Sequence, residues 1–341
     1  DSAVLQMISA DEYQAYGTTL INFAEKISSF SSPLAVGMSG NFRQMKRRIL
    51  NIAVFRKETL YQKMRALIIY LVISAVFIGC TPILSIDAST QSVYHFSNTD
   101  KNISLLDISE TFGTYDGSFV LYDNNLDSWK IYDLEEATKR IPPESTYKIY
   151  DALLGLESGI ITPEHSSMTW NGDAFPFPSW EADQDLNSAM QNSVNWYFQA
   201  IDSQLGINRV QEFLNKIEYG NQTTSSNLDL YWSDFSLKIS PLEQVTLLKK
   251  FNTNEFHLNS QNVFSVKNAI KIASTPNGNF YGKTGTGRVN GQDINGWFIG
   301  YVETSDNSYY FATNIQSDSN ATGKKAFEIT SDILKKLHIW N

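Results

Sequence analysis

Ser145-Thr146-Tyr147-Lys148 is the stretch that decides the fold, because two further short motifs follow it in a set order. Ser193-Val194-Asn195 begins 48 positions after Ser145, and Lys283-Thr284-Gly285 begins 138 positions after it. An S-x-x-K motif alone is weak evidence, since about one arises by chance in a chain of this length. The ordered series S-x-x-K, S-x-N and K-T-G is far more specific, and it indicates a serine nucleophile served by lysine side chains.

The residues around the first motif predict a helix that begins near Ser145. Pro142-Pro143 interrupts the chain just before it. Apolar residues then recur with helical spacing at Ile149, Ala152, Leu153 and Leu156. Because residues three apart share one side of a helical turn, Ser145 and Lys148 are expected to be neighbours. Lys148 could then accept the Ser145 proton, and the helix N-terminus would stabilise the negative charge that develops.

Lys148 can accept a proton only while its amine is neutral. We expect burial among aromatic residues, together with the positive charge of Lys283, to lower its pKa. Ser193 suits a hydroxyl relay between Lys148 and a leaving nitrogen. These three residues and Ser145 are therefore the predicted catalytic residues.

The third motif continues as Lys283-Thr284-Gly285-Thr286-Gly287, which fits an edge strand beside the nucleophile. Lys283 and the two threonine hydroxyls could meet a substrate carboxylate. Gly285 leaves room for a ligand against the backbone, and the N–H of Thr286 could join that of Ser145 in an oxyanion hole. Thr284 and Thr286 are therefore predicted substrate-binding residues.

Composition limits the possible classes of protein. The 341 residues are 42 % hydrophobic, which suffices for one large domain or two smaller ones. A formal net charge of −9 argues against direct binding of nucleic acid. Cys80 is the only cysteine, so no internal disulfide can form. The four histidines are scattered without zinc-ligand spacing, so no metal-binding residue is predicted.

Residues 66–86 form an apolar run of 21 residues that contains no charged side chain. As a helix this run would span roughly 31 Å, so we predict a transmembrane helix. Residues 1–65 carry nine Lys and Arg against five Asp and Glu. By the positive-inside rule, residues 1–65 are predicted to be cytoplasmic and residues 87–341 extracellular, in the cell membrane of a bacterium.

The sequence pattern of residues 87–341 predicts a linker followed by an α+β domain. Residues 87–110 are polar and predict a linker, and residues 111–341 form the domain. Strands are expected at 118–122, 129–132, 279–282, 296–302 and 309–315, helices between about 145 and 255, and a last helix near 326–337. Ser240-Pro241-Leu242-Glu243 has the pattern of a capped helix start. This order favours one antiparallel sheet flanked by helices.

From about Gly117 to Asn341, the chain resembles the extracellular sensor domain of the bacterial β-lactam sensor-transducers (the BlaR/MecR family), which is itself similar to class D β-lactamases. The motifs that carry the resemblance are Pro142 to Lys148, Ser193 to Tyr197, Tyr219-Gly220-Asn221, Trp232, Lys283 to Gly287 and Asn295 to Phe298. The resemblance implies a serine β-lactamase/penicillin-binding fold. It also implies a receptor that β-lactam antibiotics acylate at Ser145, which signals to induce resistance. Asn195 and Trp232 are added as substrate-binding residues.

Within this resemblance, the residue type at position 195 distinguishes a receptor from a hydrolase. Class D hydrolases have an apolar residue at this position, and their motif lysine binds carbon dioxide as a carbamate that activates the deacylating water. The Asn195 amide could instead bond the Lys148 amine and compete with the carbamate. Acylation would then proceed with slow or no deacylation. A carbon dioxide adduct on Lys148 is the only cofactor considered within this chain.

The resemblance extends to residues 1–65, which are predicted to be a remnant of a membrane zinc-protease domain. Asp11 to Leu20 is similar to the segment that follows the glutamate zinc ligand of that protease, but H-E-x-x-H is absent. Zinc is therefore expected only in an upstream part of the protein. Arg47-Arg48 resembles the region cleaved on activation, although an ordinary positive-inside pair explains it equally well. The implied partners are the membrane, the upstream protease part and a cytoplasmic transcriptional repressor.

Three alternatives remain open. The nearest is a membrane-tethered class D β-lactamase that hydrolyses β-lactams. A cell-wall transpeptidase is disfavoured by Tyr219-Gly220-Asn221 and by the small domain. A non-enzymatic adaptor with a decayed site is disfavoured because all three motifs are intact.

Overall fold

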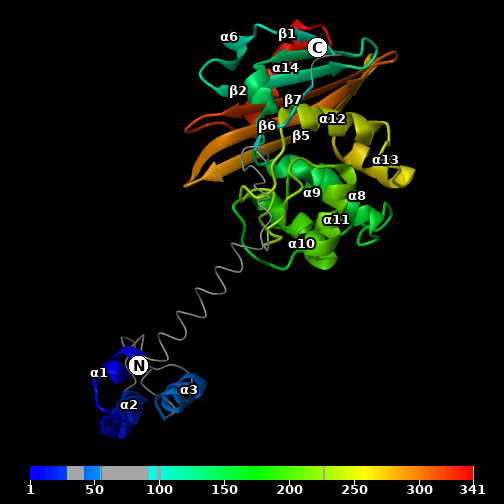
Figure 1. Cartoon of the computed structure of the whole chain (residues 1–341). Helices are drawn as coiled ribbons and strands as arrows, with labels where there is room; N and C mark the ends of the chain where they lie inside the picture. The colour runs from blue at the N-terminus through cyan, green and yellow to red at the C-terminus, as the bar shows by residue number, and fades with distance from the viewer. Residues whose placement is uncertain (29–41, 54, 56–91, 98–100, 226, 341) are drawn as a thin grey trace, which may run out of the picture. The chain divides into compact units, whose positions relative to one another are not determined.

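The structure is a computed structural model that describes residues 1–28, 42–53, 55, 92–97, 101–225 and 227–340. It divides into two compact units, Asp1–Leu84 and Ser85–Asn341, which are described separately (Figure 1). The predicted transmembrane segment 66–86 lies outside the described residues. In the described part of the chain, no helix has the length and apolar composition that a membrane crossing requires.

The first unit is helical. It contains α1 (Ser2–Met7), the short 3-10 helix η1 (Ala10–Glu12), α2 (Tyr13–Ser28) and α3 (Phe42–Ala53). Leu5 and Ile52 are buried, and the Tyr13 hydroxyl donates to the Leu5 carbonyl at 3.0 Å. Arg48, from the predicted cleavage region, pairs with the Asp1 carboxylate at 2.6 Å. An ion pair thus links α3 to the start of α1.

A seven-stranded sheet organises the second unit, in the order β1-β3-β2-β7-β6-β5-β4. Its strands are β1 (Asn102–Leu105), β2 (Asp116–Asp123), β3 (Ser128–Tyr132), β4 (Lys271–Thr275), β5 (Gly278–Val289), β6 (Gln292–Glu303) and β7 (Ser308–Gln316). All neighbouring strands pair antiparallel except β1, which runs parallel to β3. The sheet is therefore mixed, and the prediction of a purely antiparallel sheet is wrong at this edge. The segment between β1 and β3 holds a helix and a strand, which is long enough for the crossover that parallel pairing needs.

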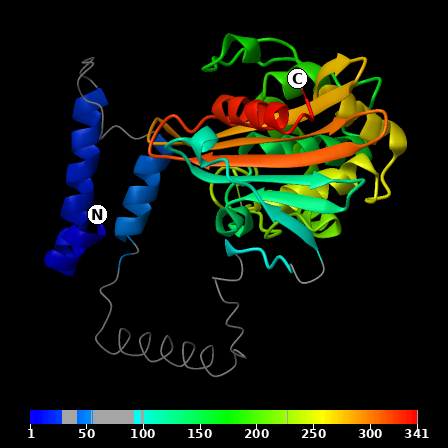
Figure 2. The same cartoon turned by 90° about the horizontal axis from the view of Figure 1, so that it is seen from above.

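Helices cover both faces of the sheet (Figure 2). On one face, α14 (Gly323–Lys336) packs its apolar side chains against Phe119, Phe298 and Phe311, and the short α6 (Ser109–Phe112) adds Phe112. The opposite face meets α7 (Leu134–Thr138) and α12 (Pro241–Asn252). Alternate residues of β6 therefore enter different cores, which explains why residues 296–302 read as a continuous apolar run.

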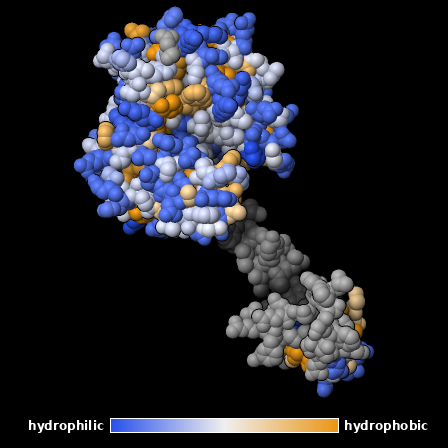
Figure 3. All heavy atoms as spheres, turned by 180° about the vertical axis from the view of Figure 1, so that it is seen from behind, coloured by the Kyte–Doolittle hydropathy of each residue, from blue (hydrophilic) through white to orange (hydrophobic). Residues whose placement is uncertain are grey.

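The remaining helices form a layer beside the sheet. They are α8 (Lys148–Glu157), α9 (Leu186–Gln191), α10 (Asn195–Leu205), α11 (Ile207–Ile217) and α13 (Ser260–Ala269). Helix α12 begins as its sequence predicts, with Ser240 as N-cap and Glu243 completing a capping box. The Glu243 carboxylate also binds Arg140 at 2.6 Å. The outer surface of this unit is mostly hydrophilic on the face shown in Figure 3.

Candidate active site

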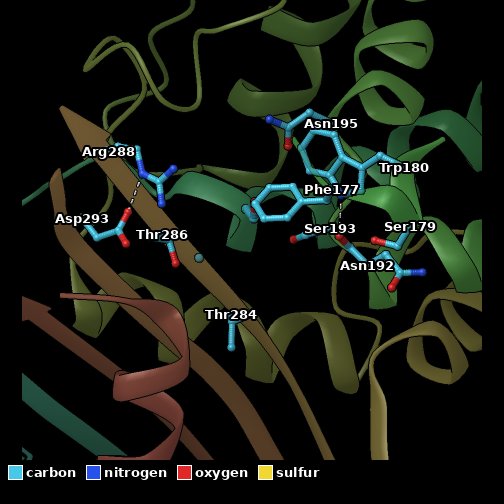
Figure 4. A pocket seen from close by; sticks show the side chains of 12 residues that line it. Phe177, Ser179, Trp180, Asn192, Ser193, Asn195, Thr284, Thr286, Arg288 and Asp293 are labelled. Atoms are coloured by element: carbon cyan, nitrogen blue, oxygen red, sulfur yellow. Dashed lines mark hydrogen bonds and ion pairs between the residues drawn. The ribbon is translucent and has the colours of Figure 1, made fainter. Parts of the chain in front are cut away.

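A pocket of about 340 Å³ brings the three sequence motifs together. Its walls come from the turn before α8, the segment before α10, strand β5 and the loop that contains the 3-10 helix η3 (Pro178–Trp180). The lining includes Ser145, Ser193, Asn195, Thr284, Gly285 and Thr286. Figure 4 shows Thr284 and Thr286 along one strand, with Ser193 and Asn195 on the other side of the pocket.

Ser145 and Lys148 are neighbours, as their spacing predicts. Ser145 lies in the 3-10 helix η2 (Glu144–Tyr147), and Lys148 is the first residue of α8. The Lys148 Nζ atom lies 3.0 Å from the Ser145 Oγ atom. Ser145 is partly exposed to the pocket, whereas the Lys148 side chain is buried. The Ser145 hydroxyl is therefore accessible from the pocket, while the Lys148 amine bonded to it is buried.

Burial controls the charge of Lys148. It lowers the Lys148 pKa to about 8, because a buried ammonium loses its hydration. The Nζ atom lies 5.5 Å from the ring centroid of Phe198 and 5.2 Å from that of Trp232. Trp232 thus lies behind the lysine and does not line the pocket, although the sequence placed it among the substrate-binding residues.

Asn195 supplies a second hydrogen-bond partner to the same amine. It is the first residue of α10, and its Oδ1 atom accepts from Lys148 Nζ at 2.8 Å. An amide oxygen can accept from either an ammonium or an amine. Asn195 therefore holds Lys148 through a second hydrogen bond, in addition to the bond to Ser145.

Ser193 is bonded to Lys283 and not to Lys148. The Lys283 Nζ atom donates to Ser193 Oγ at 2.5 Å and to the Thr284 carbonyl at 3.1 Å. Burial, followed by repulsion from Lys148, lowers the Lys283 pKa to about 7. We expected the charge of Lys283 to lower the pKa of Lys148. Instead, the charge of Lys148 lowers the pKa of Lys283. The charged groups that act on Lys148 are carboxyls, which raise its pKa.

Strand β5 passes very close to the nucleophile. A Cβ atom at Gly285 would lie 3.1 Å from the Pro143 carbonyl oxygen and 3.2 Å from the Ser145 nitrogen. Glycine therefore allows β5 to approach the turn that carries Ser145. The Thr286 Oγ1 atom accepts a bond from the Gly323 N–H at 2.9 Å, at the start of α14.

Glu144, which the sequence analysis did not predict as a site residue, directly precedes Ser145 and shapes the turn that carries it. Its backbone has a φ of +52°, and its N–H donates to the Trp232 carbonyl at 3.1 Å. The carboxyl accepts from Asn295 Nδ2 at 3.3 Å, and burial raises its pKa to about 8. The left-handed backbone at Glu144 sets the turn that presents Ser145.

Sequence reasoning also missed the outer wall of the pocket. Phe177 and Trp180 have ring centroids 5.3 Å apart, and Figure 4 shows them across from Arg288 and Asp293. Arg288 and Asp293 form an ion pair at 2.7 Å. The aromatic run from Phe175 to Trp180 is the sequence signal that could have identified one side of this wall. Among the described residues, no group of three His, Cys, Asp or Glu could hold a metal ion.

Comparisons with known proteins point to one family. Residues 87–335 match the penicillin-binding protein transpeptidase domain. The chain is 41 % identical to the regulatory protein BlaR1 of Bacillus licheniformis over its whole length, and it spans 57 % of that relative. The C-terminal domain of the Bacillus licheniformis BlaR penicillin-receptor matches 71 % of the chain at 45 % identity, with 99 % of that domain covered and a TM-score of 0.69. The class D β-lactamase BAT-2 matches 69 % of the chain at 36 % identity, with 97 % of that enzyme covered and a TM-score of 0.65.

Proposed function

The chain belongs to the penicillin-binding transpeptidase-domain family and, within it, to the BlaR/MecR group, and on that premise we propose that it is part of a membrane receptor for β-lactam antibiotics. The antibiotic acylates Ser145, and the long-lived adduct is the signal that induces resistance. The observation that carries this proposal is the position of Lys148, which touches both Ser145 and Asn195 at hydrogen-bond distance. One contact serves acylation, and the other opposes deacylation.

Acylation begins when the neutral Lys148 amine takes the Ser145 proton. The Ser145 Oγ atom then bonds to the β-lactam carbonyl carbon, and the backbone N–H groups of Ser145 and Thr286 stabilise the oxyanion. The ring C–N bond breaks, and the leaving nitrogen takes the Ser193 proton, which the Lys283 ammonium replaces through its bond to Ser193 Oγ while Lys148 keeps the Ser145 proton. No atom leaves the antibiotic, so the protein gains its full mass.

The same pocket suits the carboxylate that β-lactams carry. Lys283 and the hydroxyls of Thr284 and Thr286 are the polar groups along β5 that would bind it. A β-lactam carboxylate next to Lys283 favours the ammonium form of this residue, whose pKa burial holds at about 7. Antibiotic binding would therefore charge Lys283 as it places the ring carbonyl over Ser145.

The decisive test is covalent capture by the whole chain. Incubation with benzylpenicillin should add the mass of the intact antibiotic, and peptide mass spectrometry should place it on Ser145. Ser145→Ala should abolish the adduct while its circular dichroism spectrum and melting temperature stay close to those of the wild type. An adduct on any other residue, or no adduct in the wild type, would refute the proposal.

A class D β-lactamase is the alternative, and the match to BAT-2 favours it. Steady-state hydrolysis of a chromogenic β-lactam separates the two. A receptor shows one burst equal to the protein concentration and then almost no turnover. Continued turnover at saturating antibiotic would assign the chain to the hydrolases.

The wider assignment follows the family. We propose that residues 66–86 cross the cell membrane of a bacterium, that residues 1–65 are the cytoplasmic remnant of a zinc-protease domain, and that residues 111–341 form the extracellular sensor after a linker. Zinc belongs to the upstream protease part. Acylation outside the cell is passed to that part and through it to a cytoplasmic transcriptional repressor, without direct contact between this chain and nucleic acid.

A further inference from the structure

The pocket has a charged side that the proposed acylation chemistry does not use. Arg288 and Asp293 are the only charged side chains that line it in the part of the chain that the structure describes. Lys148 and Lys283, which serve acylation, are buried and are not among the lining residues. The Arg288 side chain is 57 % exposed, against 21 % for that of Asp293. A ligand in the pocket can therefore reach the guanidinium.

Strand β5 sets the order of the groups along the pocket. Lys283 is the proposed partner of the ring carboxylate, and the Thr286 N–H belongs to the proposed oxyanion hole. Arg288 follows Thr286 by two residues, which is about 7 Å further along a strand. In a penicillin, the ring carboxylate and the acylamino side chain are attached on opposite sides of the lactam carbonyl. A penicillin held by Lys283 and Thr286 therefore directs its acylamino side chain toward Arg288.

The Arg288 guanidinium has free hydrogen-bond donors. Pairing between β5 and β6 shifts after Gly287, so that Arg288 lies opposite Asp293. The Arg288 Nε atom donates to Asp293 Oδ1 at 2.7 Å. Among the described residues, neither terminal nitrogen of Arg288 makes a hydrogen bond. Because a guanidinium carries N–H donors on every nitrogen, the two terminal nitrogens remain available for a second carboxylate.

The other side of the pocket suits an aromatic group. Phe177 and Trp180 line it, and Figure 4 shows Arg288 across from them. The Trp180 Nε1–H donates to the Asn192 carbonyl at 3.0 Å, and the Trp196 Nε1–H donates to the Trp180 carbonyl at 2.9 Å. These bonds hold the aromatic side in place. An antibiotic side chain that combines an aromatic ring with an anion can thus contact both sides of the pocket.

We propose that Arg288 is a specificity-determining residue that favours β-lactams with a carboxylate on the acylamino side chain. The inference rests on the proposed function, since it concerns the choice of antibiotic by the same site. The terminal nitrogens of Arg288 donate to the side-chain carboxylate, while Nε keeps its bond to Asp293. Arg288 acts on the binding of the antibiotic and takes no part in the acylation of Ser145. An ammonium on the same side chain is disfavoured, because it meets a like charge.

Three penicillins that differ at one carbon atom test this choice. On the side-chain α-carbon, benzylpenicillin carries a hydrogen, carbenicillin a carboxylate and ampicillin an ammonium. The acylation efficiency of the whole chain is measured for each, and the values for carbenicillin and ampicillin are divided by that for benzylpenicillin with the same variant. This ratio cancels any general loss of activity. The measurement is made at about pH 6.5, below the ordinary pKa of an α-amino group, so that ampicillin is charged.

Arg288→Gln should lower the carbenicillin ratio at least about threefold, which is the scale of one partly exposed ion pair. It should raise the ampicillin ratio at least about twofold, because Asp293 is then left unpaired. Arg288→Lys keeps the charge, and its carbenicillin ratio should stay above that of Arg288→Gln. Arg209→Gln is the control with both ratios unchanged, because Arg209 is exposed on α11 and does not line the pocket. Opposite shifts for the two charges would not arise from a general loss of structure.

Carbenicillin and ampicillin ratios that are the same in Arg288→Gln and in the wild type would overturn the inference. An equal loss with benzylpenicillin and carbenicillin would give this result, because Arg288 would then bind the ring carboxylate that all three antibiotics share. A second measurement requires no acylation: the affinities of Ser145→Ala for carbenicillin and benzylpenicillin, with and without Arg288→Gln, by ligand-observed NMR. If Ser145 fails to react with β-lactams, the proposed function is wrong, while these affinities still decide the role of Arg288.

Discussion

At the scale of single residues, the protonation state of the Lys148 amine decides whether acylation of Ser145 can begin. Lys148 accepts the Ser145 proton only as a neutral amine, and burial lowers its pKa to about 8. Above that pH most of the lysine is already neutral. Below it the ammonium dominates, and the acylation rate should fall about tenfold for each pH unit well below the midpoint.

We therefore predict that the acylation rate rises with pH from 6 to 8 and then levels off. Lys148→Ala should slow acylation by at least ~100-fold and remove this pH dependence, because the general base is lost. Stopped-flow acylation by a chromogenic cephalosporin measures both quantities. Lys250→Ala provides a control, since Lys250 pairs with Glu218 away from the pocket. A pH profile that survives in Lys148→Ala would assign the base to another residue.

Asn195 carries the prediction about how long the adduct lasts. Its Oδ1 atom lies 2.8 Å from Lys148 Nζ and would compete with carbon dioxide for the amine. Asn195→Val removes this competitor and should speed deacylation in the presence of bicarbonate. A change of about 1.4 kcal/mol in the balance corresponds to tenfold in its equilibrium constant.

Adduct lifetime, followed by intact-mass spectrometry with and without bicarbonate, tests this prediction. Acceleration that requires bicarbonate supports competition at Lys148. If Asn195→Val leaves the lifetime unchanged in both conditions, the slow step lies in access of water to the ester.

The sequence predicted the members of the site better than their contacts. Short motifs list the chemical groups, so the spacing of S-x-x-K predicted that Ser145 and Lys148 are neighbours, and the resemblance to the sensor family predicted a bond between Asn195 and Lys148. Spacing does not reveal which groups bond, so Ser193 was expected between Lys148 and the leaving nitrogen, whereas its bond is to Lys283.

At the scale of elements, the turn Tyr219-Gly220-Asn221 holds the segment that carries Trp232. The Asn221 side chain accepts from the Lys238 N–H at 2.9 Å and donates to the Ser236 carbonyl at 2.7 Å. The Tyr219 ring packs against Tyr147 at 5.2 Å between centroids. A turn whose residues do not line the pocket therefore fixes the aromatic packing next to Lys148.

Gly220 is the weak point of this turn. It has a φ of +52°, and a Cβ atom there would collide with the Lys238 carbonyl oxygen. Gly220→Ala should lower the free energy of unfolding by about 2–3 kcal/mol, because strain and collision add, and it should slow acylation as Trp232 shifts. Denaturant unfolding and the acylation rate measure these two effects.

Gly159→Ala is the matched control for this change. Gly159 also has a positive φ, +70°, but a Cβ atom there would meet nothing within 4 Å. It should lose only about 1 kcal/mol from backbone strain and should acylate at the wild-type rate. Equal losses in both variants would show that the close approach at Lys238 is unimportant.

Strands in the centre of the sheet were easier to predict than those at its edges. β6 and β7 are buried on both faces, so their apolar runs are unmistakable. The edge strand β4 is mostly exposed and contains a bulge, and β1 is short and mostly exposed within a segment predicted to be a linker. Edge strands with no buried face lack the alternation that sequence analysis needs.

At the scale of the whole molecule, charged residues are distributed unevenly along the chain. The chain has a net charge of −9, yet its first 65 residues contain an excess of Lys and Arg. This asymmetry is the pattern expected if the apolar run 66–86 separates a cytoplasmic flank from an external domain.

We predict that a protease added to intact bacteria cleaves residues beyond about 90 and spares residues 1–65. In the proposed topology, the basic flank would hold the N-terminal side in the cytoplasm, where the membrane shields it, while the sensor would face the protease. Mass spectrometry of the fragments reports which segments remain. Permeabilised cells are the control, in which residues 1–65 should also be digested. The reverse protection in intact cells would exclude an external sensor, because β-lactams reaching Ser145 would then have to cross the membrane first.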